Sequence, residues 1–203
     1  MDERERWNTR YASRVNTHEE EPHPFLREHL ALLPRGRALE LAIGEGHNAI
    51  FLARRGFSVT GLDVSDIAVE RSLRMSQVAG VAIEAQCTDL RTTTLPADAY
   101  DAVVCFYYLQ RDLFSQVVNT LRTGGMVIYE TFTGEQARYG HPTNPDHLLR
   151  PNELLEAFRA LRIRIYRDLI IQGPKAVASL VGEKALRRRG SIKWPLSSLL
   201  RQK

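Results

Sequence analysis

The chain of 203 residues lacks the features of secreted and membrane-spanning proteins. Its two cysteines, Cys87 and Cys105, are too few for a disulfide framework, and both adjoin apolar runs, where cysteine usually packs as a small hydrophobic residue. The apolar runs at 38–43, 101–106 and 126–129 fall far short of the roughly 20 residues that a bilayer span requires. The charged N-terminus MDERERWNTRY is unlike a secretory signal. We therefore expect a cytoplasmic protein without a membrane partner.

The sequence also lacks the residue spacings that indicate a metal site. The pairs His18/His23 and His141/His147 have neither helical i, i+4 spacing nor companion cysteines. Internal repeats and low-complexity linkers are missing too, which predicts one globular domain with additions. We expect no bound metal, and either a monomer or a homodimer.

The net charge of +4 comes from one end of the chain. Residues 184–203 hold seven basic residues and no acidic one, which leaves a net charge of −3 for residues 1–183. A stretch such as EKALRRRGSIKW is typical of a solvated terminus. It also keeps open the alternative of RNA binding through this tail, which would weaken steeply with added salt.

From residue 38 onward, short runs rich in β-branched and aromatic residues alternate with longer helical segments. This alternation predicts βαβ units and a parallel sheet. Ser65 or Asp66 is the expected N-cap of the second helix and Gly80 its expected stop, while Gly124-Gly125 is expected to end the third. The predicted strands are 38–43, 57–63, 81–87, 100–106, 126–132, 162–171 and 175–181, and the helices between the first five are 47–55, 66–79 and 111–122.

Two helices are predicted ahead of the sheet. Residues 4–14 form a helix that places Trp7 and Tyr11 on one face, and a second helix follows near 24–33. An aromatic pair with this spacing either packs in a core or covers a ligand. We expect a helical cap over residues 1–35.

The pattern changes after Phe132. Residues 133–150 are polar and long for a loop inside a compact domain, which is typical of a functional or mobile segment. A helix is predicted near 151–160, before the last two strands. We expect the core domain to extend over 36–183 and the basic tail over 184–203.

The first predicted strand runs into a glycine loop. Gly44 and Gly46 lack the Cβ that would keep a ligand from the backbone, and the following helix offers free N–H groups. GEGHNA also satisfies the G-x-G-x-x-G/A dinucleotide pattern, which keeps an NAD(P)-dependent oxidoreductase open. Asp63 follows Gly44 by 19 positions, the distance at which a carboxylate accepts ribose hydroxyls of NAD and of other adenosine ligands.

Acidic residues around this loop argue against a dinucleotide. Glu45 lies between the glycines, where a pyrophosphate would bind, and two like charges ~4 Å apart repel by about 4 kcal/mol at a surface-like dielectric. Glu40 precedes the loop in the same strand, and Asp89 follows the third strand as Asp63 follows the second. A cationic ligand is compatible with these charges.

Four motifs, in order, resemble those of class I S-adenosylmethionine-dependent methyltransferases. ELAIGEG resembles the E-x-x-x-G-x-G first motif, VTGLDVS the ribose-binding strand end, CTDLR the adenine-contacting segment, and LRTGGMVIYE the L-x-P-G-G turn before the fifth strand. Ala42 stands where many members have glycine, and Thr123 where proline is usual. The resemblance covers roughly residues 4–181. It implies an α/β, Rossmann-like, mostly parallel sheet of seven strands, the last one antiparallel, with helices on both faces.

The resemblance also implies S-adenosyl-L-methionine as the cofactor, a ligand without phosphate whose sulfonium and ammonium groups are positive. By resemblance, Glu40 faces the amino-acid end and Asp63 holds the ribose. Asp89 and Leu90 flank the adenine, and Phe106 packs near the methionine moiety. The implied cofactor-binding residues are Glu40, Gly44, Glu45, Gly46, Asp63, Val64, Asp89, Leu90 and Phe106, with Trp7 and Tyr11 from the cap.

For the acceptor, the sequence excludes two classes. Methyl transfer from a sulfonium needs positioning and desolvation rather than a dedicated base, so we assign no catalytic residue. CFYYLQ lacks the [N/D/S]-P-P-[Y/F/W] motif of exocyclic-amine methyltransferases, and Cys105 lacks the preceding proline of cytosine-C5 enzymes. An RNA-directed methyltransferase using the basic tail remains the alternative.

Three segments, WNTRY, GHNAIFLARRG and GHPTNPDHLLRPNELLEAF, resemble the small tellurite-resistance and thiopurine-methyltransferase-like branch, which methylates small, soft or polarizable acceptors. This implies a small-molecule acceptor such as a thiol or a chalcogen oxyanion. If the segment 133–150 closes over the acceptor, the polar side chains expected to orient it are Tyr107, Glu130, Arg138, Tyr139, His141 and His147.

Overall fold

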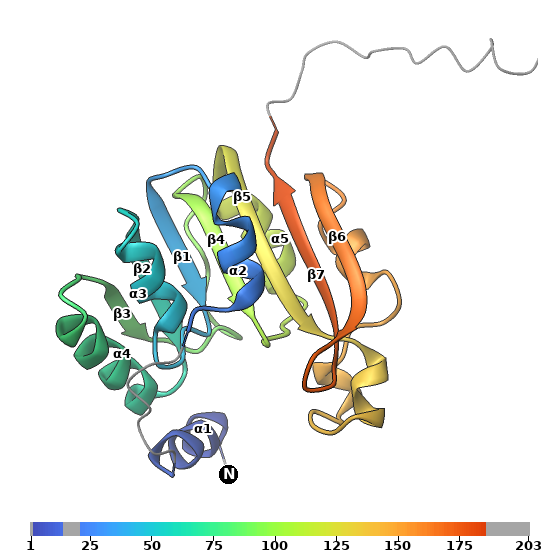
Figure 1. The fold of residues 1–203 in the computed structure, drawn as a ribbon, viewed down its shortest axis with the longest axis horizontal. Coiled ribbons are helices and arrows are strands. Elements are labelled where there is room, and N and C mark those ends of the chain that lie inside the picture. The colour runs from blue at the N-terminus through green and yellow to red at the C-terminus, as the bar shows by residue number, and fades with distance from the viewer. Residues whose placement is uncertain (1, 14–20, 186–203) are drawn as a thin grey trace, which may run out of the picture.

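The computed structural model describes residues 2–13 and 21–185, which fold around one seven-stranded sheet (Figure 1). Its strands are β1 (Arg37–Leu41), β2 (Ser58–Asp63), β3 (Glu84–Cys87), β4 (Tyr100–Phe106), β5 (Leu121–Phe132), β6 (Arg162–Ile171) and β7 (Lys175–Glu183). They lie in the order β3-β2-β1-β4-β5-β7-β6. β1 to β5 pair in parallel, and β7 is antiparallel to both of its neighbours. The predicted sheet of seven strands with the last one antiparallel is confirmed.

Helices cover both faces of the sheet, as predicted (Figure 1). The front face in this view carries α2 (Pro24–His29), α3 (His47–Ala53) and α4 (Asp66–Val78), and the back face α5 (Leu113–Thr120) and α6 (Glu153–Ala157). α1 (Glu3–Ala12) lies below the edge at which β1 and β4 end, next to α4. Short 3-10 helices are η1 (Leu30–Leu32), η2 (Gly134–Arg138) and η3 (Pro145–His147).

Local sequence signals explain most helix boundaries. The Ser65 side chain accepts a hydrogen bond from the Ala68 N–H at the start of α4, and Gly80, with φ +69°, follows the end of that helix. At α1, the capping box of Asp2 and Glu5 satisfies the first N–H groups. These caps hold each helix to a fixed position relative to the strand ends.

The boundary between α5 and β5 differs from the sequence prediction. α5 ends at Thr120, and β5 begins at Leu121 and runs through Gly124-Gly125, which were expected to end the helix. The sheet is irregular here, because the β4–β5 register shifts after Tyr100. A Cβ at Gly125 would lie 2.8 Å from the Arg122 carbonyl oxygen. The two glycines therefore serve an irregular strand.

Two apolar clusters hold the layers together. The cluster on the α5 side includes Phe114, Tyr129 and Phe158, and the cluster on the α2 side includes Phe25 and Ile128. Alternating residues of β5 thus supply both faces, as expected for a strand covered on both sides. Among the described helices, none has the length and apolar character to cross a membrane. The predicted basic tail, from residue 186, lies outside the described residues.

The chain order places a ligand-binding position at the middle of the sheet. β1 is followed by β2 on one side, whereas β4 lies on the other side of β1, so the connections diverge between β1 and β4. In open α/β sheets, ligands bind outside the carboxyl ends of the strands at such a point.

Candidate cofactor and acceptor site

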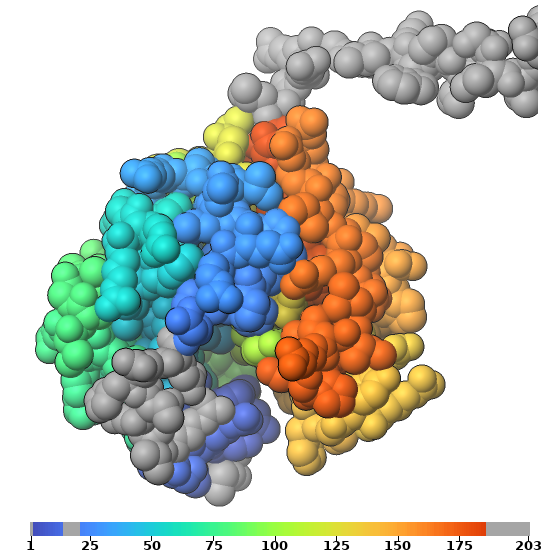
Figure 2. Space-filling model, viewed as in Figure 1, coloured from blue at the N-terminus to red at the C-terminus, as the bar shows by residue number. Residues whose placement is uncertain are grey.

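A pocket of about 230 Å³ lies at this switch point, between the strand ends and α1. Figure 2 shows the molecule hollowed at the same edge, between α1 in dark blue and the yellow segment that follows β5. The pocket is lined by Glu3, Trp7, Arg10, Tyr11, Ala42, Asp63, Val64, Asp89, Leu90, Phe106, Tyr107 and Tyr108.

The glycine loop borders this pocket without side chains of its own. Gly44 and Gly46 have φ of +55° and +84°, values that favour glycine. A Cβ at Gly44 would lie 2.9 Å from the Tyr11 hydroxyl oxygen, and one at Gly46 would lie 2.8 Å from the Ser72 Cβ. Both glycines are therefore required by space as well as by backbone conformation.

Asp63 joins the loop to the pocket. Its Oδ2 accepts a hydrogen bond from the Gly44 N–H and its Oδ1 accepts one from the Ser65 N–H, both at 2.9 Å. Burial raises the pKa of this carboxyl above its usual value, opposed by those hydrogen bonds. Each carboxylate oxygen can accept a second hydrogen bond, so Asp63 can hold the loop and still accept ligand hydroxyls.

Two residues with positive φ mark the ends of the central strands. Ala42, just after β1, has φ +54°, and Tyr107, just after β4, has φ +57°. Non-glycine residues in this conformation are strained and cluster at ligand sites. Both line the pocket. The two strand ends that flank the switch point therefore turn sharply beside the ligand position.

Glu40 lies under the loop, fully buried in β1. Its Oε1 accepts a hydrogen bond of 2.8 Å from the Asn48 side chain, and its Oε2 has no hydrogen-bond partner among the described residues. Burial raises the pKa of Glu40 to about 8. A buried carboxyl with one free oxygen is suited to a cationic group at the amino-acid end of a ligand.

Glu45, expected at the cofactor, is not among the residues that line the pocket. Its carboxylate forms an ion pair of 2.7 Å with Arg71 of α4, and the His47 ring lies 4.0 Å away. The carboxylate is therefore balanced by a cation. The argument that Glu45 repels a pyrophosphate is not supported, and Asp63 and Asp89 are the predicted acids that line the pocket.

Trp7 and Tyr11 of α1 line the pocket. Their rings lie 5.9 Å apart on one helix face. The Asn8 side chain fixes this helix by donating to Asp66 at 2.6 Å and accepting from the Ser65 hydroxyl at 2.6 Å. α1 is thus tied to the loop that follows Asp63.

A second set of contacts holds α1 to Asp89, the residue predicted to flank the adenine. Arg91 pairs with Glu3 of α1 at 2.8 Å and with Asp89 at 2.7 Å. The hydrogen bonds from Arg91 lower the pKa of Asp89. Asp89 is therefore ionised and paired, and the predicted residues Val64, Leu90 and Phe106 complete the apolar lining.

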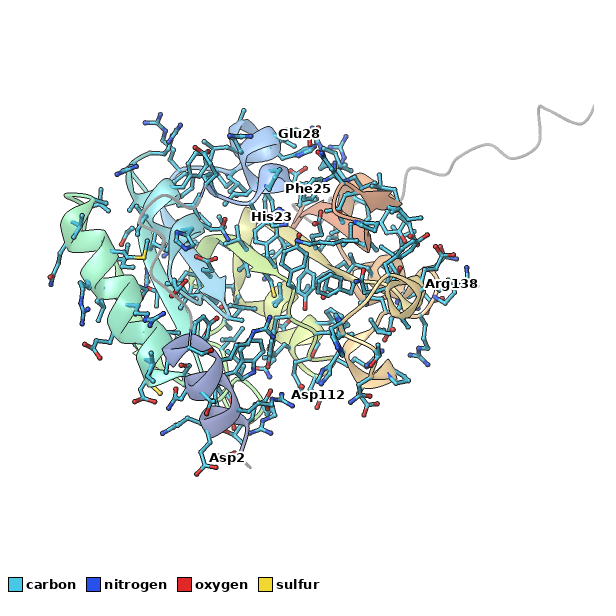
Figure 3. The ribbon with its side chains drawn as sticks, turned by 60° about the horizontal axis from the view of Figure 1, so that its bottom comes forward. Asp2, His23, Phe25, Glu28, Asp112 and Arg138 are labelled. Atoms are coloured by element: carbon cyan, nitrogen blue, oxygen red, sulfur yellow. The ribbon has the colours of Figure 1, made fainter. Side chains whose placement is uncertain are left out.

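The predicted acceptor residues separate into two groups. Tyr107 lines the pocket, whereas Glu130 is fully buried behind it. Figure 3 shows Arg138 at the periphery, well away from His23 near the middle of the molecule. The other predicted residues of this segment, Tyr139, His141 and His147, are also exposed, and none of these four lines the pocket.

Arg111 explains the position of that segment. Its guanidinium donates to the carbonyl oxygens of Asp146 and Leu148 and pairs with the Glu153 carboxylate at 2.6 Å. The segment is therefore fixed to the α5 side of the sheet and does not cover the pocket. This tie joins residues 35 to 42 positions apart, and no local pattern signals it.

Glu130 belongs to a buried polar cluster that sequence reasoning missed. Its carboxylate lies 3.1 Å from His23 Nε2 and 3.4 Å from Arg167, and it accepts a hydrogen bond from Ser179. Burial alone would raise the pKa of Glu130, but these partners bring it below its usual value. His23 Nδ1 accepts from the Phe25 N–H and its ring stacks on Phe106 at 4.1 Å.

The structure adds four pocket residues that the sequence analysis did not assign: Glu3, Arg10, Ala42 and Tyr108. A signal existed for the first two, because positions 3, 7, 10 and 11 recur at helical spacing on one face of α1. Among the residues described, no three His, Cys, Asp or Glu side chains are grouped to hold a metal ion.

Residues 38–125 match the family described as a methyltransferase domain. Among curated proteins, hemagglutinin 1 of Eikenella corrodens is 31% identical over 99 residues, 47% of this chain and 33% of that protein. The S-adenosyl-L-methionine-dependent Diels-Alderase of Talaromyces variabilis is 44% identical over 52 residues, 26% of this chain and 18% of that protein. The matches thus span a third or less of these curated relatives.

Solved structures share the fold over most of the chain. The structure reported for conversion of a disulfide bond into a thioacetal group during echinomycin biosynthesis has a TM-score of 0.68 at 17% identity, over 89% of this chain and 92% of that one. TehB from Haemophilus influenzae has a TM-score of 0.68 at 15% identity, and the match covers 89% of this chain and 66% of that one. A geranyl diphosphate C-methyltransferase from Streptomyces coelicolor, in complex with S-adenosyl-L-homocysteine, has a TM-score of 0.63 at 18% identity. That match covers 79% of this chain and 77% of the other.

Residues 38–125 thus match a methyltransferase domain, in agreement with the class predicted from the sequence motifs, the class I S-adenosylmethionine-dependent methyltransferases, and solved methyltransferases share the fold. S-adenosyl-L-methionine is the cofactor of this class. TehB shares the fold of this chain.

Proposed function

We propose that this chain transfers a methyl group from S-adenosyl-L-methionine to a small-molecule acceptor in the pocket at the sheet's switch point. The carrying observation is the arrangement of Asp63 and the glycine loop, in which the Asp63 carboxylate accepts a hydrogen bond from the Gly44 N–H while Gly44 and Gly46 adopt positive φ. The cofactor supplies the activated methyl group.

The residues present fit this cofactor. Asp63 accepts the ribose hydroxyls while it holds the Gly44 N–H, and the free oxygen of Glu40 accepts from the ammonium group. Val64 and Leu90 provide apolar walls for the adenine, and Trp7 excludes water from the open side.

The pocket geometry favours catalysis by positioning. The His23 ring stacks on Phe106 of the pocket wall, but its Nδ1 accepts from a backbone N–H and its Nε2 faces Glu130, so neither nitrogen is available to an acceptor. The Cys105 thiol is fully buried, and burial raises its pKa to about 12, which removes it as a nucleophile. An acceptor that needs no base is therefore favoured.

Such an acceptor is a thiol or a chalcogen oxyanion, the class expected from the sequence. A thiolate or an oxyanion has an available lone pair near neutral pH and loses no proton in the transfer. The echinomycin structure, reported for chemistry at sulfur, supports sulfur as an acceptor atom in this fold. The segment after β5 does not cover the pocket, which leaves room for the acceptor beside Tyr107.

The test is transfer of label from S-adenosyl-L-methionine to a panel of thiols, selenite, tellurite, small amines, carboxylates and RNA. We expect transfer to thiols or chalcogen oxyanions. Transfer to RNA alone, lost on deletion of residues 184–203, would favour the alternative of an RNA-directed enzyme. Absence of transfer to every acceptor, with S-adenosylhomocysteine bound, would contradict the proposed acceptor class.

A further inference from the structure

Lys175 lies beside the acceptor side of the pocket. The hairpin between β6 and β7 reaches the carboxyl edge of the sheet, and Lys175 is the first residue of β7 (Figure 1). Its Nζ lies 4.8 Å from the centre of the Tyr107 ring and 3.5 Å from the Tyr107 hydroxyl oxygen. Tyr107 lines the pocket, and Lys175 contacts Tyr107 from outside the set of lining residues.

The Tyr107 ring is held firmly in this position. It stacks on Phe132 with centroids 4.8 Å apart and meets the His23 ring edge-on at 5.1 Å. Its backbone N–H donates to the Glu130 carbonyl oxygen, which fixes the turn at φ +57°. The hydroxyl is therefore a positioned group, and Lys175 donates to it from the outer side.

The side chains of Lys175 and Tyr107 have unused hydrogen-bond donors. Within residues 2–13 and 21–185, no carboxylate lies within ion-pair distance of the half-buried Lys175 ammonium. Burial and the nearby Glu130 charge raise the pKa of Tyr107 to about 12, so its hydroxyl keeps its proton. In the same described part of the chain, that O–H has no acceptor. A half-buried cation and a phenol without acceptors favour an anion.

Among the other cations, Arg167 pairs with Glu130 and Glu28, Arg71 with Glu45, and Arg91 with Glu3 and Asp89, whereas the guanidinium of the pocket residue Arg10 lies over the Trp7 ring. The chain has only four lysines, at positions 175, 184, 193 and 203, against 24 arginines. The ammonium of a lysine is a compact charge with rotatable donors, which suits a small anion better than the planar fork of arginine.

We propose that Lys175 and Tyr107 form an anion-binding subsite that recognises a negatively charged group on the methyl acceptor. This inference rests on the proposed methyltransferase function and narrows its acceptors to small acids and oxyanions. Asp63 lies at the end of β2, on the other side of the switch point from Tyr107 and Lys175.

The test measures ligand binding to the full chain saturated with S-adenosylhomocysteine, by calorimetry. The probes are selenite and two matched pairs, 3-mercaptopropionate with 3-mercaptopropionamide and 4-hydroxybenzoate with 4-hydroxybenzamide. We expect at least one anion to bind about tenfold more tightly than its neutral partner, or selenite to bind measurably, the gain typical of one charge-assisted hydrogen bond. Binding of none of the anions, or equal binding of each matched pair with no selenite bound, overturns the inference.

Three variants assign the effect to this pair. Lys175→Met keeps the length of the side chain and removes its charge, and we expect it to lose the anion preference. Lys175→Arg keeps the charge and should retain most of the anion preference. Tyr107→Phe should lose part of that preference. S-adenosylhomocysteine should bind the two Lys175 variants as it binds the wild type, so a failure of cofactor binding in the wild type identifies a failure of the proposed function instead. Unchanged anion binding by Lys175→Met contradicts the subsite.

Acylation with acetic anhydride, read by mass spectrometry, locates the anion directly. Lys184 serves as the internal reference, because its Nζ is engaged by Asp98 and by two backbone carbonyls far from the pocket. The preferred anion should slow modification of Lys175 and leave Lys184 unchanged. Equal rates at Lys175 with and without the anion contradict the assignment.

Discussion

The buried Glu40 carboxyl makes stability depend on pH in a way that one substitution can isolate. Glu40 is 3% exposed, and burial raises its pKa from 4.5 to about 8. In Glu40→Gln the side chain keeps its shape and its contact with Asn48, but it does not titrate. The difference in unfolding free energy between the two proteins therefore reports on this carboxyl, since other titrating groups cancel.

The sign follows from the direction of the shift. A carboxyl whose pKa is higher in the folded state binds its proton more tightly there, so its stabilising contribution is complete below pH 4.5 and is lost as the pH rises to about 8. At ~1.4 kcal/mol per pKa unit, the interval between 4.5 and about 8 corresponds to about 5 kcal/mol. The advantage of Glu40→Gln over the wild type should grow toward that value between pH 5 and 9.

The assay is urea unfolding of both proteins at pH 5, 6, 7, 8 and 9, followed by circular dichroism. A difference in unfolding free energy that stays constant across this range would refute the reasoning, because it would mean that Glu40 titrates alike in the folded and unfolded chains. S-adenosylhomocysteine, whose ammonium group favours the ionised carboxylate, should release a proton on binding to the wild type near pH 7 and not to the variant. Calorimetry in two buffers measures that release.

Three further substitutions test the loop, the cap and the tie of the segment after β5. Gly46→Ala should abolish S-adenosylhomocysteine binding, because its Cβ would lie 2.8 Å from the Ser72 Cβ, whereas Gly56→Ala, with similar φ and open space, should bind normally; equal effects of the two would show that space in the loop is unimportant. Trp7→Ala should raise the Kd for S-adenosylhomocysteine about tenfold, the loss expected for part of one buried aromatic side chain, with the unliganded melting temperature unchanged. An unaltered Kd by calorimetry would show that α1 does not contribute to the cofactor site. Burial would raise the pKa of Glu153, but Arg111 and Arg150 hold it at about 2, so its contribution is present above pH 4.5 and lost as the pH falls toward 2. Glu153→Gln should cost about 2 kcal/mol at pH 7 and little at pH 2.5, and a pH-independent cost in denaturant titrations would contradict this.

The parts predicted best from the sequence are those set by local chemistry. Gly44 and Asp63 were placed by a spacing that follows from how a strand, a tight loop and a second strand meet at one edge. Trp7 and Tyr11 were placed by helical periodicity alone. Since both signals are short-range, no knowledge of packing was needed.

The parts predicted poorly depend on partners far along the chain. Glu45 was expected to face the ligand, but Arg71, 26 positions later, pairs with it. Arg138 and its neighbours were expected to close over the acceptor, but Arg111 ties their segment elsewhere. The His23–Glu130 pair joins a helix cap to a strand across the sheet. Such pairings are set by the packed fold and produce no periodic pattern in the sequence.

The most direct test of the central claim is calorimetric titration of the full chain with S-adenosylhomocysteine and, separately, with NADP. We expect one molecule of S-adenosylhomocysteine to bind per chain and NADP not to bind. Near 100-fold excess over its Kd, the bound ligand should add about 2.7 kcal/mol of stability and raise the melting temperature by several degrees. Binding of NADP with no heat or thermal shift from S-adenosylhomocysteine would contradict the assignment of this pocket.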